Sequence, residues 1–457
     1  MKIIILGAGQ VGSNLAEHLV REGNDLTVVD LDAEKLADLQ DRFDLRTICG
    51  QASHTSILKQ AGADDADMLV AVTLNDETNI VACKLAGTLF NIPTKIARIR
   101  ALDYMKHPQL FDADHFGVDH VIAPEQEITD YLRKLIDYPE ALQVVDFGKG
   151  RARLVAMKAR AGGPLVGHEL RDLQKHLPGL DARVAAIFRR DRTIVPEGRT
   201  VIQDSDEIFF IAATENIRAV MKEMRRGDKS VRRVMIAGGG NIGQRLARSL
   251  ESDYEVKLID RNKKNTERLA SALKNTLVLT GDATDEDLLL QENIEDMDVF
   301  CALTNDDEDN IMSSLLAKRL GAKKVIALIN RSTYVDLLQG GEIDIALSPA
   351  QATIGPLLTH IRRGDMAVVH SLRRGAAEAL EAVVHGDTRS SKLVGKRIEE
   401  VELPEGVSIG AVLRGTQVTI AHHDTVVEPE DHLILFVPNK RMIPKVEKLF
   451  QVGLGFF

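Results

Sequence analysis

The first thirty residues place the strongest limits on how this chain can fold. An apolar run leads into Gly-Ala-Gly-Gln-Val-Gly at 7–12, a helical pattern follows, and the next apolar run ends at Asp30. Gly7 permits a tight turn, Gly9 lets the backbone approach a pyrophosphate, and Gly12 lets helix and strand pack closely. Asp30 stands where a carboxylate can accept both hydroxyls of a ribose. This order predicts a strand, a turn and a helix whose N-terminus holds the pyrophosphate of an adenine dinucleotide.

Strand and helix patterns alternate through the rest of this first unit. Further apolar strand patterns lie at 46–49, 68–72, 95–99 and 120–122. The βαβαβ order is typical of a doubly wound parallel sheet, an α/β fold. Thr73 follows the fourth strand and is therefore expected at the carboxyl edge, where such sheets bind ligands. Arg98 and Arg100 belong to the fifth strand, where an arginine could hold a nucleotide phosphate or pair with a surface carboxylate.

The chain repeats its opening at an offset of about 231 residues, which brings Gly7 onto Gly238. A second apolar run precedes three glycines at the same spacing, and the following apolar run again ends in an aspartate, Asp260. Thr304 falls on Thr73 in the same register. The matching glycines are Gly238, Gly240 and Gly243. The chain is therefore predicted to be an internal duplication of a whole structural unit.

Each sheet unit is followed by two further segments. A helical pattern with proline in its first turn leaves the sheet unit, and its apolar face could pack on its own sheet or on a second subunit. A small α+β domain of short β-branched strands, without a glycine fingerprint, is expected after each of these exit helices. The predicted divisions are 1–123 and 231–348 for the dinucleotide-binding domains, 124–140 and 349–364 for the exit helices, and 141–226 and 365–457 for the small domains.

The two copies differ at residues that would touch a ligand. Leu328 stands in the second copy where the first has Arg98. Arg261 directly follows Asp260, and an arginine at this place can accommodate a ribose 2′-phosphate. The two sites therefore need not bind the same ligand. The acidic run at 306–309 begins a helix, where it complements the helix dipole or could contact a cation or a ribose.

Composition and motif content argue against several classes of function. A net charge of −10 argues against general nucleic-acid binding, and no apolar run approaches the ~20 residues that span a bilayer. An oxidoreductase would need an acid or base facing the nicotinamide, and the histidines of this chain are poor candidates for that role. His168, His176 and the run at 422–424 are expected to be exposed polar loop residues without a complete metal-ligand set. No catalytic or metal-binding residue is therefore assigned, which suggests that the nucleotide binds as a signal and is not chemically converted.

The tandem fingerprints, each followed by an aspartate and then by a small unit bearing Leu-Val-Gly (165–167 and 393–395), resemble tandem RCK domains, the regulators of K⁺ conductance. The length, the duplication and the opening residues resemble the cytosolic regulatory subunits of bacterial Trk potassium uptake. The resemblance implies a homo-oligomeric ring, peripheral on the inner face of the cell membrane, that gates a K⁺-translocating partner of the TrkH kind. It also implies that NAD(H), and ATP or ADP, bias the conformation of that ring without enzymatic turnover.

The ligand-binding residues carried over from this resemblance fall on the two fingerprints and on the strand ends beside them. They are Gly7, Ala8, Gly9, Gln10, Val11, Gly12, Asp30, Thr73 and Arg98 in the first copy, and Gly238, Gly239, Gly240, Asn241, Ile242, Gly243, Asp260 and Thr304 in the second. Valine at Gly9 or Gly12 is expected to block the pyrophosphate and leave the fold intact. Two other functions remain open: an NAD-dependent oxidoreductase, and a soluble nucleotide sensor without a membrane partner.

Overall fold

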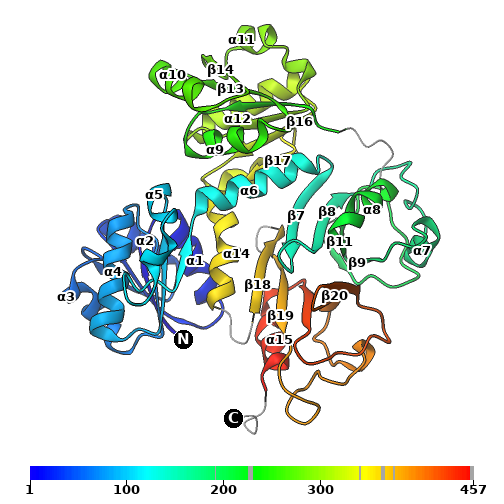
Figure 1. The fold of residues 1–457 in the computed structure, drawn as a ribbon, viewed down its shortest axis with the longest axis horizontal. Helices are drawn as coiled ribbons and strands as arrows, with labels where there is room; N and C mark the ends of the chain where they lie inside the picture. Colours follow the sequence, from blue (N-terminus) through cyan, green and yellow to red (C-terminus); the bar gives the residue numbers. More distant parts are fainter. Residues whose placement is uncertain (191, 225–229, 339–340, 362–365, 374–375, 453–457) are drawn as a thin grey trace.

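The computed structural model describes residues 1–190, 192–224, 230–338, 341–361, 366–373 and 376–452. Within these ranges the strands form two six-stranded parallel sheets and two five-stranded antiparallel sheets, in alternating order along the chain (Figure 1). This confirms the predicted duplication of a doubly wound unit followed by a smaller one. Among the described residues, every helix is too short or too polar to cross a bilayer.

The first parallel sheet has the strand order β3-β2-β1-β4-β5-β6. The predicted strands are confirmed to within one residue at each end. Their bounds are β1 Lys2–Leu6, β2 Asp25–Asp30, β3 Arg46–Cys49, β4 Met68–Ala71, β5 Thr94–Arg98 and β6 His120–Ile122. The helices are α1 Gln10–Val20, α2 Ala33–Arg42, α3 Thr55–Gln60, η1 Ala63–Asp65, α4 Asp76–Phe90, α5 Leu102–Met105 and η2 Pro108–Phe111. The strand order reverses between β1 and β4, so the first glycine turn lies at the topological switch point.

The second parallel sheet repeats this arrangement as β14-β13-β12-β15-β16-β17. Its strands are β12 Arg233–Ala237, β13 Glu255–Asp260, β14 Thr276–Thr280, β15 Val299–Ala302, β16 Lys324–Leu328 and β17 Ile345–Leu347. Its helices are α9 Asn241–Leu250, α10 Lys263–Ala272, α11 Glu286–Gln291, η5 Ile294–Asp296, α12 Asp307–Arg319 and α13 Ser332–Leu338. The central strands of both sheets are buried on both faces, which explains their continuous apolar sequence.

The two antiparallel sheets belong to the small domains and pack against each other. The first contains β7 Ala141–Phe147, β8 Ala152–Lys158, β9 Ala182–Arg189, β10 Arg192–Ile194 and β11 Glu207–Ala213, with η3 Leu170–Asp172, α7 Leu173–His176, η4 Thr214–Asn216 and α8 Ile217–Met224. The second contains β18 Met366–Leu372, β19 Ala377–Val383, β20 Ser408–Arg414, β21 Gln417–Ile420 and β22 His432–Val437, with η7 Ile398–Glu400, η8 Lys440–Met442 and α15 Ile443–Phe450. Phe188 and Phe209 of one sheet contact Phe436 of the other within a shared apolar cluster.

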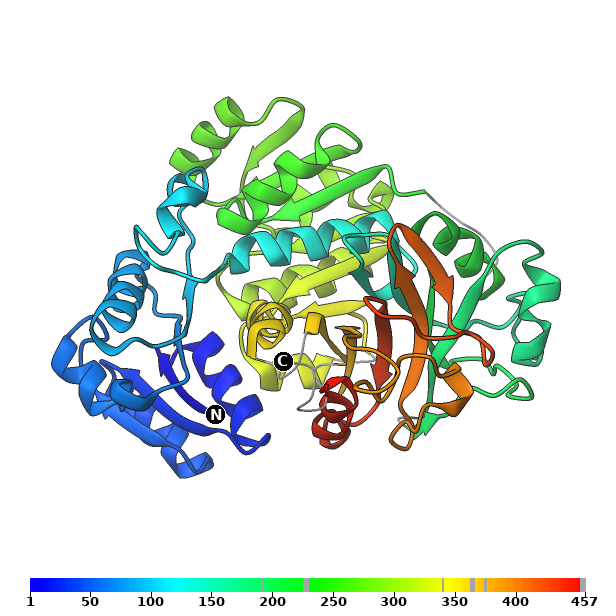
Figure 2. The same ribbon diagram turned by 60° about the horizontal axis from the view of Figure 1, so that its bottom comes forward.

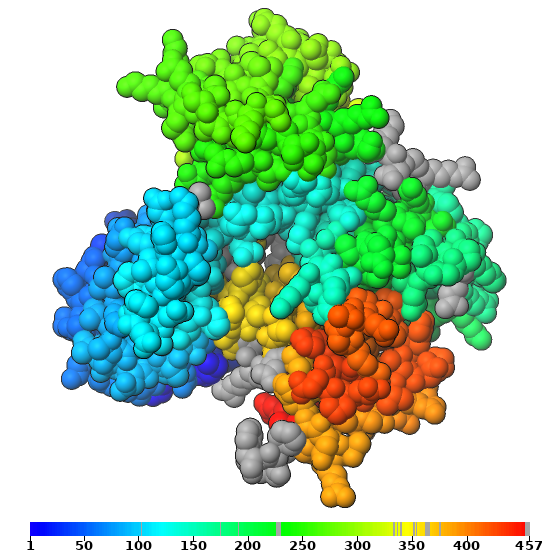
Figure 3. Space-filling view, viewed as in Figure 1, coloured from blue at the N-terminus to red at the C-terminus, as the bar shows by residue number. Residues whose placement is uncertain are grey.

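The exit helices exchange partners between the two halves of the chain. The helix α6 (Pro124–Asp137) packs against α9 of the second sheet, and α14 (Pro349–Ile361) packs against α1 of the first. The two helices also contact each other at the centre of the molecule, surrounded by the four domains (Figures 1, 2 and 3). The predicted end of the second exit helix, 362–364, lies outside the described residues.

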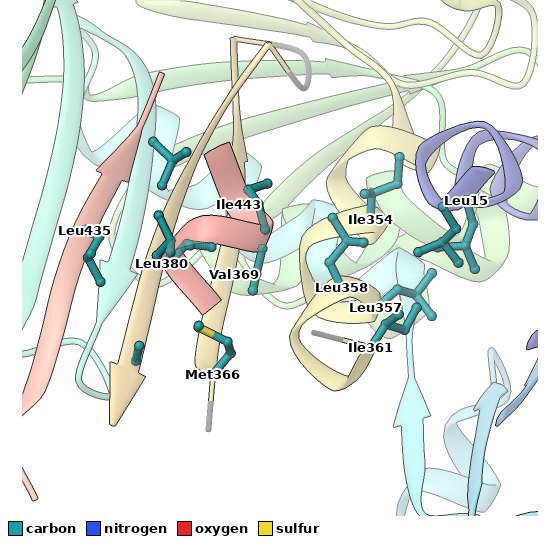
Figure 4. Close-up of a cluster of buried hydrophobic side chains, with 14 of the residues drawn as sticks. Leu15, Ile354, Leu357, Leu358, Ile361, Met366, Val369, Leu380, Leu435 and Ile443 are labelled. Atoms are coloured by element: carbon teal, nitrogen blue, oxygen red, sulfur yellow. The ribbon is translucent and has the colours of Figure 1, made fainter. Parts of the chain in front are cut away.

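This exchange answers a question that the sequence left open. Leu132 of α6 shares a buried cluster with Leu246 of α9. In the other half, α14 lies between α1 and β18, with Leu357 on the side of Leu15 and Leu358 on the side of Val369 (Figure 4). The expectation that these faces are buried against another sheet domain is confirmed, but that domain belongs to the same chain and is not the helix's own sheet.

One contact of α14 with the first sheet is titratable. The rings of His120 on β6 and His360 on α14 stack with their centroids 3.6 Å apart and their planes inclined by 13°. At the matching places in the other half stand Ile345 on β17 and Leu135 on α6, both in the apolar cluster. Burial lowers the pKa of His120 below its usual range and that of His360 to about 4. The pair is therefore neutral near pH 7 (about 6.5 being the ordinary histidine pKa).

Lowering the pH should weaken the contact between His120 and His360. The unfolded chain binds protons at the ordinary histidine pKa of about 6.5, whereas folded His360 binds one only near 4, so stability falls as the pH is lowered through this window. The double variant His120→Ile with His360→Leu copies the other half and should lose less thermal stability between about pH 7.5 and about pH 5 than the parent chain. Buried His370 is common to both proteins and cancels in the comparison. Equal losses in thermal unfolding midpoint would contradict the prediction.

Candidate nucleotide sites

The three glycines of the first turn have separate physical roles. Gly7 between β1 and α1 has a φ of +109°, which favours glycine, and a β-carbon there would lie 3.0 Å from the backbone nitrogen of Thr73. Gly9 has open space around it, with no atom within 4 Å of an added β-carbon. A β-carbon on Gly12 would lie 1.9 Å from the carbonyl oxygen of Gly7. Gly7 and Gly12 are thus needed by the fold, and Gly9 leaves room for a ligand.

Both fingerprint helices have uncapped N-termini. Gly9 and Gly240 are the N-cap residues of α1 and α9, and no described side chain caps either helix. By contrast, Asp32 and Asp285 cap α2 and α11 by accepting backbone N–H bonds. Free N–H groups at a helix N-terminus, together with the helix dipole, favour an anion such as a pyrophosphate. Gln10 and Val11, and Asn241 and Ile242, form these first turns.

The aspartates at the ends of β2 and β13 brace the glycine turns. Asp30 accepts the backbone N–H of Ala8 through Oδ2 at 2.6 Å and that of Asp32 through Oδ1 at 2.9 Å. Asp260 accepts the backbone N–H of Gly239 in the same way at 2.8 Å. Both oxygens of Asp30 and Oδ1 of Asp260 keep a further lone pair, so ribose hydroxyls can still donate to them, whereas Oδ2 of Asp260 also accepts from the side-chain amide of Asn265. Sequence reasoning assigned only the ribose role, because a bond between residues 22 positions apart has no local signal.

A buried asparagine holds the strand ends together at each site. In the first copy, Asn79 accepts the backbone N–H of Thr73 at 3.0 Å and donates to the carbonyl oxygen of Arg98 at 2.9 Å. In the second copy, Asn310 accepts the N–H of Thr304 at 2.9 Å and donates to the carbonyl of Leu328 at 2.8 Å. Thr73 and Thr304 are thereby fixed beside the glycine turns.

Arg98 pairs with a carboxylate that the sequence did not single out. Its guanidinium lies 3.5 Å from Glu125 in the first turn of α6, and the two side chains are only 13% and 12% exposed. Burial lowers the pKa of Arg98 below its ordinary value, and Glu125 opposes this effect. Among the described residues, Arg98 Nε and Glu125 Oε2 are buried without a hydrogen-bond partner. The second copy has apolar Leu328 and Ala350 at these places.

The remaining charged candidates of the second copy have structural roles. Asp306 caps α12 by accepting the N–H of Asp309 at 2.9 Å, which confirms the helix-start interpretation of the acidic run. Asp307 is buried and accepts the N–H of Arg331 at 2.9 Å. The side chain of Arg261 is 74% exposed and lies 3.4 Å from Asp309, free to turn toward a ligand at Asp260.

The histidines considered as catalytic candidates lie in the small domains. His176 contacts Glu223 at 3.0 Å, and His422 contacts Asp181 at 3.1 Å. Within the described part of the chain, no group of three or more His, Cys, Asp or Glu side chains could hold a metal ion.

The two glycine turns, by contrast, provide N–H donors that suit a pyrophosphate and a carboxylate that can accept hydrogen bonds from a ribose.

Comparison with known proteins gives a consistent match over the whole chain. The TrkA-N domain family matches residues 3–124 and 234–349, and the TrkA-C domain family matches residues 154–225 and 388–451. The chain is 60% identical over 457 residues to the "Trk system potassium uptake protein TrkA" of Halomonas elongata, and 50% identical over 457 residues to that of Haemophilus influenzae. Both alignments cover 100% of each chain.

Solved structures share the fold. "Crystal Structure of the GsuK RCK domain" aligns with a TM-score of 0.60 and 18% identity, covering 98% of this chain and 94% of that chain. "GsuK channel bound to NAD" aligns with a TM-score of 0.61 and 19% identity, covering 98% of this chain and 78% of that chain. At these identities the similarity concerns the arrangement of the elements, which confirms the expected tandem RCK fold.

The glycine geometry predicts opposite outcomes for two neighbouring substitutions. Gly12→Ala should destabilise the protein by about 1–3 kcal/mol, because its β-carbon would collide with a backbone carbonyl that cannot move aside. Gly9→Ala should leave stability within about 0.5 kcal/mol, the usual range for a site without such contacts. Thermal unfolding of the two variants tests this. The earlier expectation that valine at Gly12 would spare the fold is wrong for the same reason, and equal midpoints for the two alanine variants would contradict the assignment.

Proposed function

The chain belongs to the TrkA family of Trk system potassium uptake proteins, and from this premise we propose that it is the cytosolic regulatory subunit of such a system. It acts at the inner face of the cell membrane on a K⁺-translocating partner of the TrkH kind. The observation that carries the proposal is the pair of uncapped glycine turns, each braced by an aspartate, in a chain similar to TrkA proteins over its full length.

The ligands of the two turns are nucleotides that bias the conformation of the protein. NAD(H) fits the glycine fingerprint with a following aspartate, and a channel that shares the fold is described as bound to NAD. ATP or ADP fits the first copy in particular, because Arg98 ends β5 at the same carboxyl edge of the sheet as the glycine turn and supplies a positive charge there. The second copy replaces this arginine with Leu328 and carries exposed Arg261, so its ligand preference differs. The nucleotide binds as a signal and is not chemically converted.

Potassium flux into vesicles that contain the membrane partner tests this function. The parent chain should confer nucleotide-dependent uptake, and the coupling expected between ligand and conformation is about 1–3 kcal/mol, or a 5- to 150-fold change in the linked equilibrium. Gly9→Val should abolish the response that depends on the first site, because its side chain fills the ligand space without touching the fold. Gly240→Val, which is equally open, is the matched variant for the second site.

The outcomes separate the competing functions. Unaltered nucleotide responses in both valine variants would contradict the assignment of the two turns. Turnover of a substrate, followed by absorbance at the NADH band, would favour an oxidoreductase. Failure to associate with any membrane protein would favour a soluble nucleotide sensor.

A homo-oligomeric ring is part of the proposal, and the exposed apolar residues indicate where its subunits meet. Val81 and Leu89 on α4 are 45% and 54% exposed and lie eight residues apart on one face of the helix. Met312 occupies the place of Val81 on α12 of the second copy and is 59% exposed. Apolar side chains gathered on an outer helix face are typical of a protein interface.

Negative charge introduced on the exposed apolar face of α4 should dissociate the ring. Val81→Asp with Leu89→Asp should give a smaller species in light scattering and leave the thermal unfolding midpoint of the subunit within a few degrees, because neither side chain is part of the core. Leu277→Asp is the matched control, since Leu277 is 50% exposed on the edge strand β14, away from these helices. An unchanged mass for the double variant would mean that the subunits meet elsewhere.

A further inference from the structure

The first turn of α6 is held from two sides by arginines of two different domains. Glu125 receives Arg98 of the first sheet at 3.5 Å. The adjacent residue, Gln126, accepts a hydrogen bond through Oε1 from Nη1 of Arg245 at 3.2 Å. Nη2 of the same Arg245 donates to the carbonyl oxygen of Arg100 at 3.1 Å, just beyond the end of β5. Arg245 therefore joins the exit helix and the strand end that carries Arg98.

Arg245 belongs to the helix of the other nucleotide site. It lies on α9, five residues after the N-cap Gly240, so it is one and a half turns from the second glycine turn. An α-helix moves as a stiff unit over this length, and a shift of its N-terminus moves Arg245 with it. The acceptors of this guanidinium lie beside the Arg98–Glu125 pair, because Gln126 directly follows Glu125 and Arg100 lies two residues after Arg98. Two side-chain contacts and the peptide bond between Glu125 and Gln126 thus form a short path of four residues: Arg98, Glu125, Gln126 and Arg245.

The matching contact around the second sheet lacks the charged residues of this path. Asn14 on α1 matches Arg245, Ala350 matches Glu125, and Leu328 matches Arg98, whereas Gln126 has an identical counterpart in Gln351. A short amide and two apolar side chains replace two guanidiniums and a carboxylate. The two halves otherwise share the exchange of exit helices and the same strand order. The charged path is therefore not a requirement of the fold.

We infer that Arg245 is a positioning residue that couples the two nucleotide sites through the first turn of α6. This inference rests on the proposed function, because it requires a nucleotide at each turn. A phosphate that reaches Arg98 competes with Glu125 for the guanidinium, and the pair is open to this competition because Arg98 Nε and Glu125 Oε2 have no other hydrogen bond among the described residues. Release of Glu125 moves the first turn of α6, and Arg245 transmits the movement to α9. A ligand at the second turn acts along the same path in reverse, as linkage requires.

Hydrogen exchange on the full chain in the Gly9→Val background tests the coupling. In this background only the second turn can take a ligand, and NADH and ATP serve as separate probes. Either nucleotide that binds should slow exchange at residues 238–243 and should also change exchange at residues 124–128, in the first turn of α6, where the amide protons belong to residues 125–128 because Pro124 has none. Adding Arg245→Gln should abolish the change at 124–128 and keep the protection at 238–243. Arg248→Gln, an exposed arginine on the next turn of α9, is the matched control and should keep both changes.

The results distinguish this inference from the function on which it rests. An unaltered change at 124–128 in the Arg245→Gln chain would overturn the coupling role and leave nucleotide binding in place. Protection at 238–243 with no change at 124–128 in the starting chain would overturn it as well. No protection at 238–243 with either probe would overturn the proposed nucleotide function of the second turn. Similar thermal unfolding midpoints for the Arg245→Gln and Arg248→Gln chains would show that the loss of signal is not a loss of fold.

Discussion

The exchange of exit helices is the contact on which the rest of the structure depends. The apolar faces of α6 and α14 are each buried against the sheet domain of the opposite half, and the two helices contact each other at the centre. The exchanged helices therefore hold the two halves together. Burial of their apolar faces fixes both glycine turns relative to this shared pair of helices.

Duplication within one chain allows the two halves to differ where a symmetric dimer of identical chains could not. Charged or titratable pairs lie where the first sheet meets the exit helices, namely Arg98 with Glu125 and His120 with His360. Apolar pairs occupy the matching places where the second sheet meets the exit helices: Leu328 with Ala350, and Ile345 with Leu135. The fold tolerates either set because the helices pack in the same way in both halves. The polar set adds an ion pair and two titratable rings, and the apolar set adds only packing.

The proposed ribose acceptors are the same carboxylates that brace the glycine turns. Asp30 and Asp260 each accept a backbone N–H of the turn, so the turn fixes the orientation of the carboxylate. In the second copy, the side-chain amide of Asn265 also donates to Asp260 at 3.0 Å, which occupies acceptor capacity that remains open at Asp30. This is a second physical reason, beside the missing arginine, for the two sites to differ in ligand preference.

The sequence by itself determined the strands of the first parallel sheet to within a residue, the two glycine turns, the aspartates that follow them and the duplication. These features depend on local spacing, which sets side-chain periodicity and backbone conformation over a few residues. The tertiary structure alone decided that α6 packs on α9 and α14 on α1, that Arg98 meets Glu125, and that Arg245 reaches Arg100. An apolar stripe shows that a helix face must be buried, but it does not determine which element covers that face. A charged residue likewise does not determine which opposite charge it will pair with. Those partners are set by how the chain folds back on itself, over 27 residues for Arg98 and Glu125 and over more than a hundred residues for Arg245 and its acceptors.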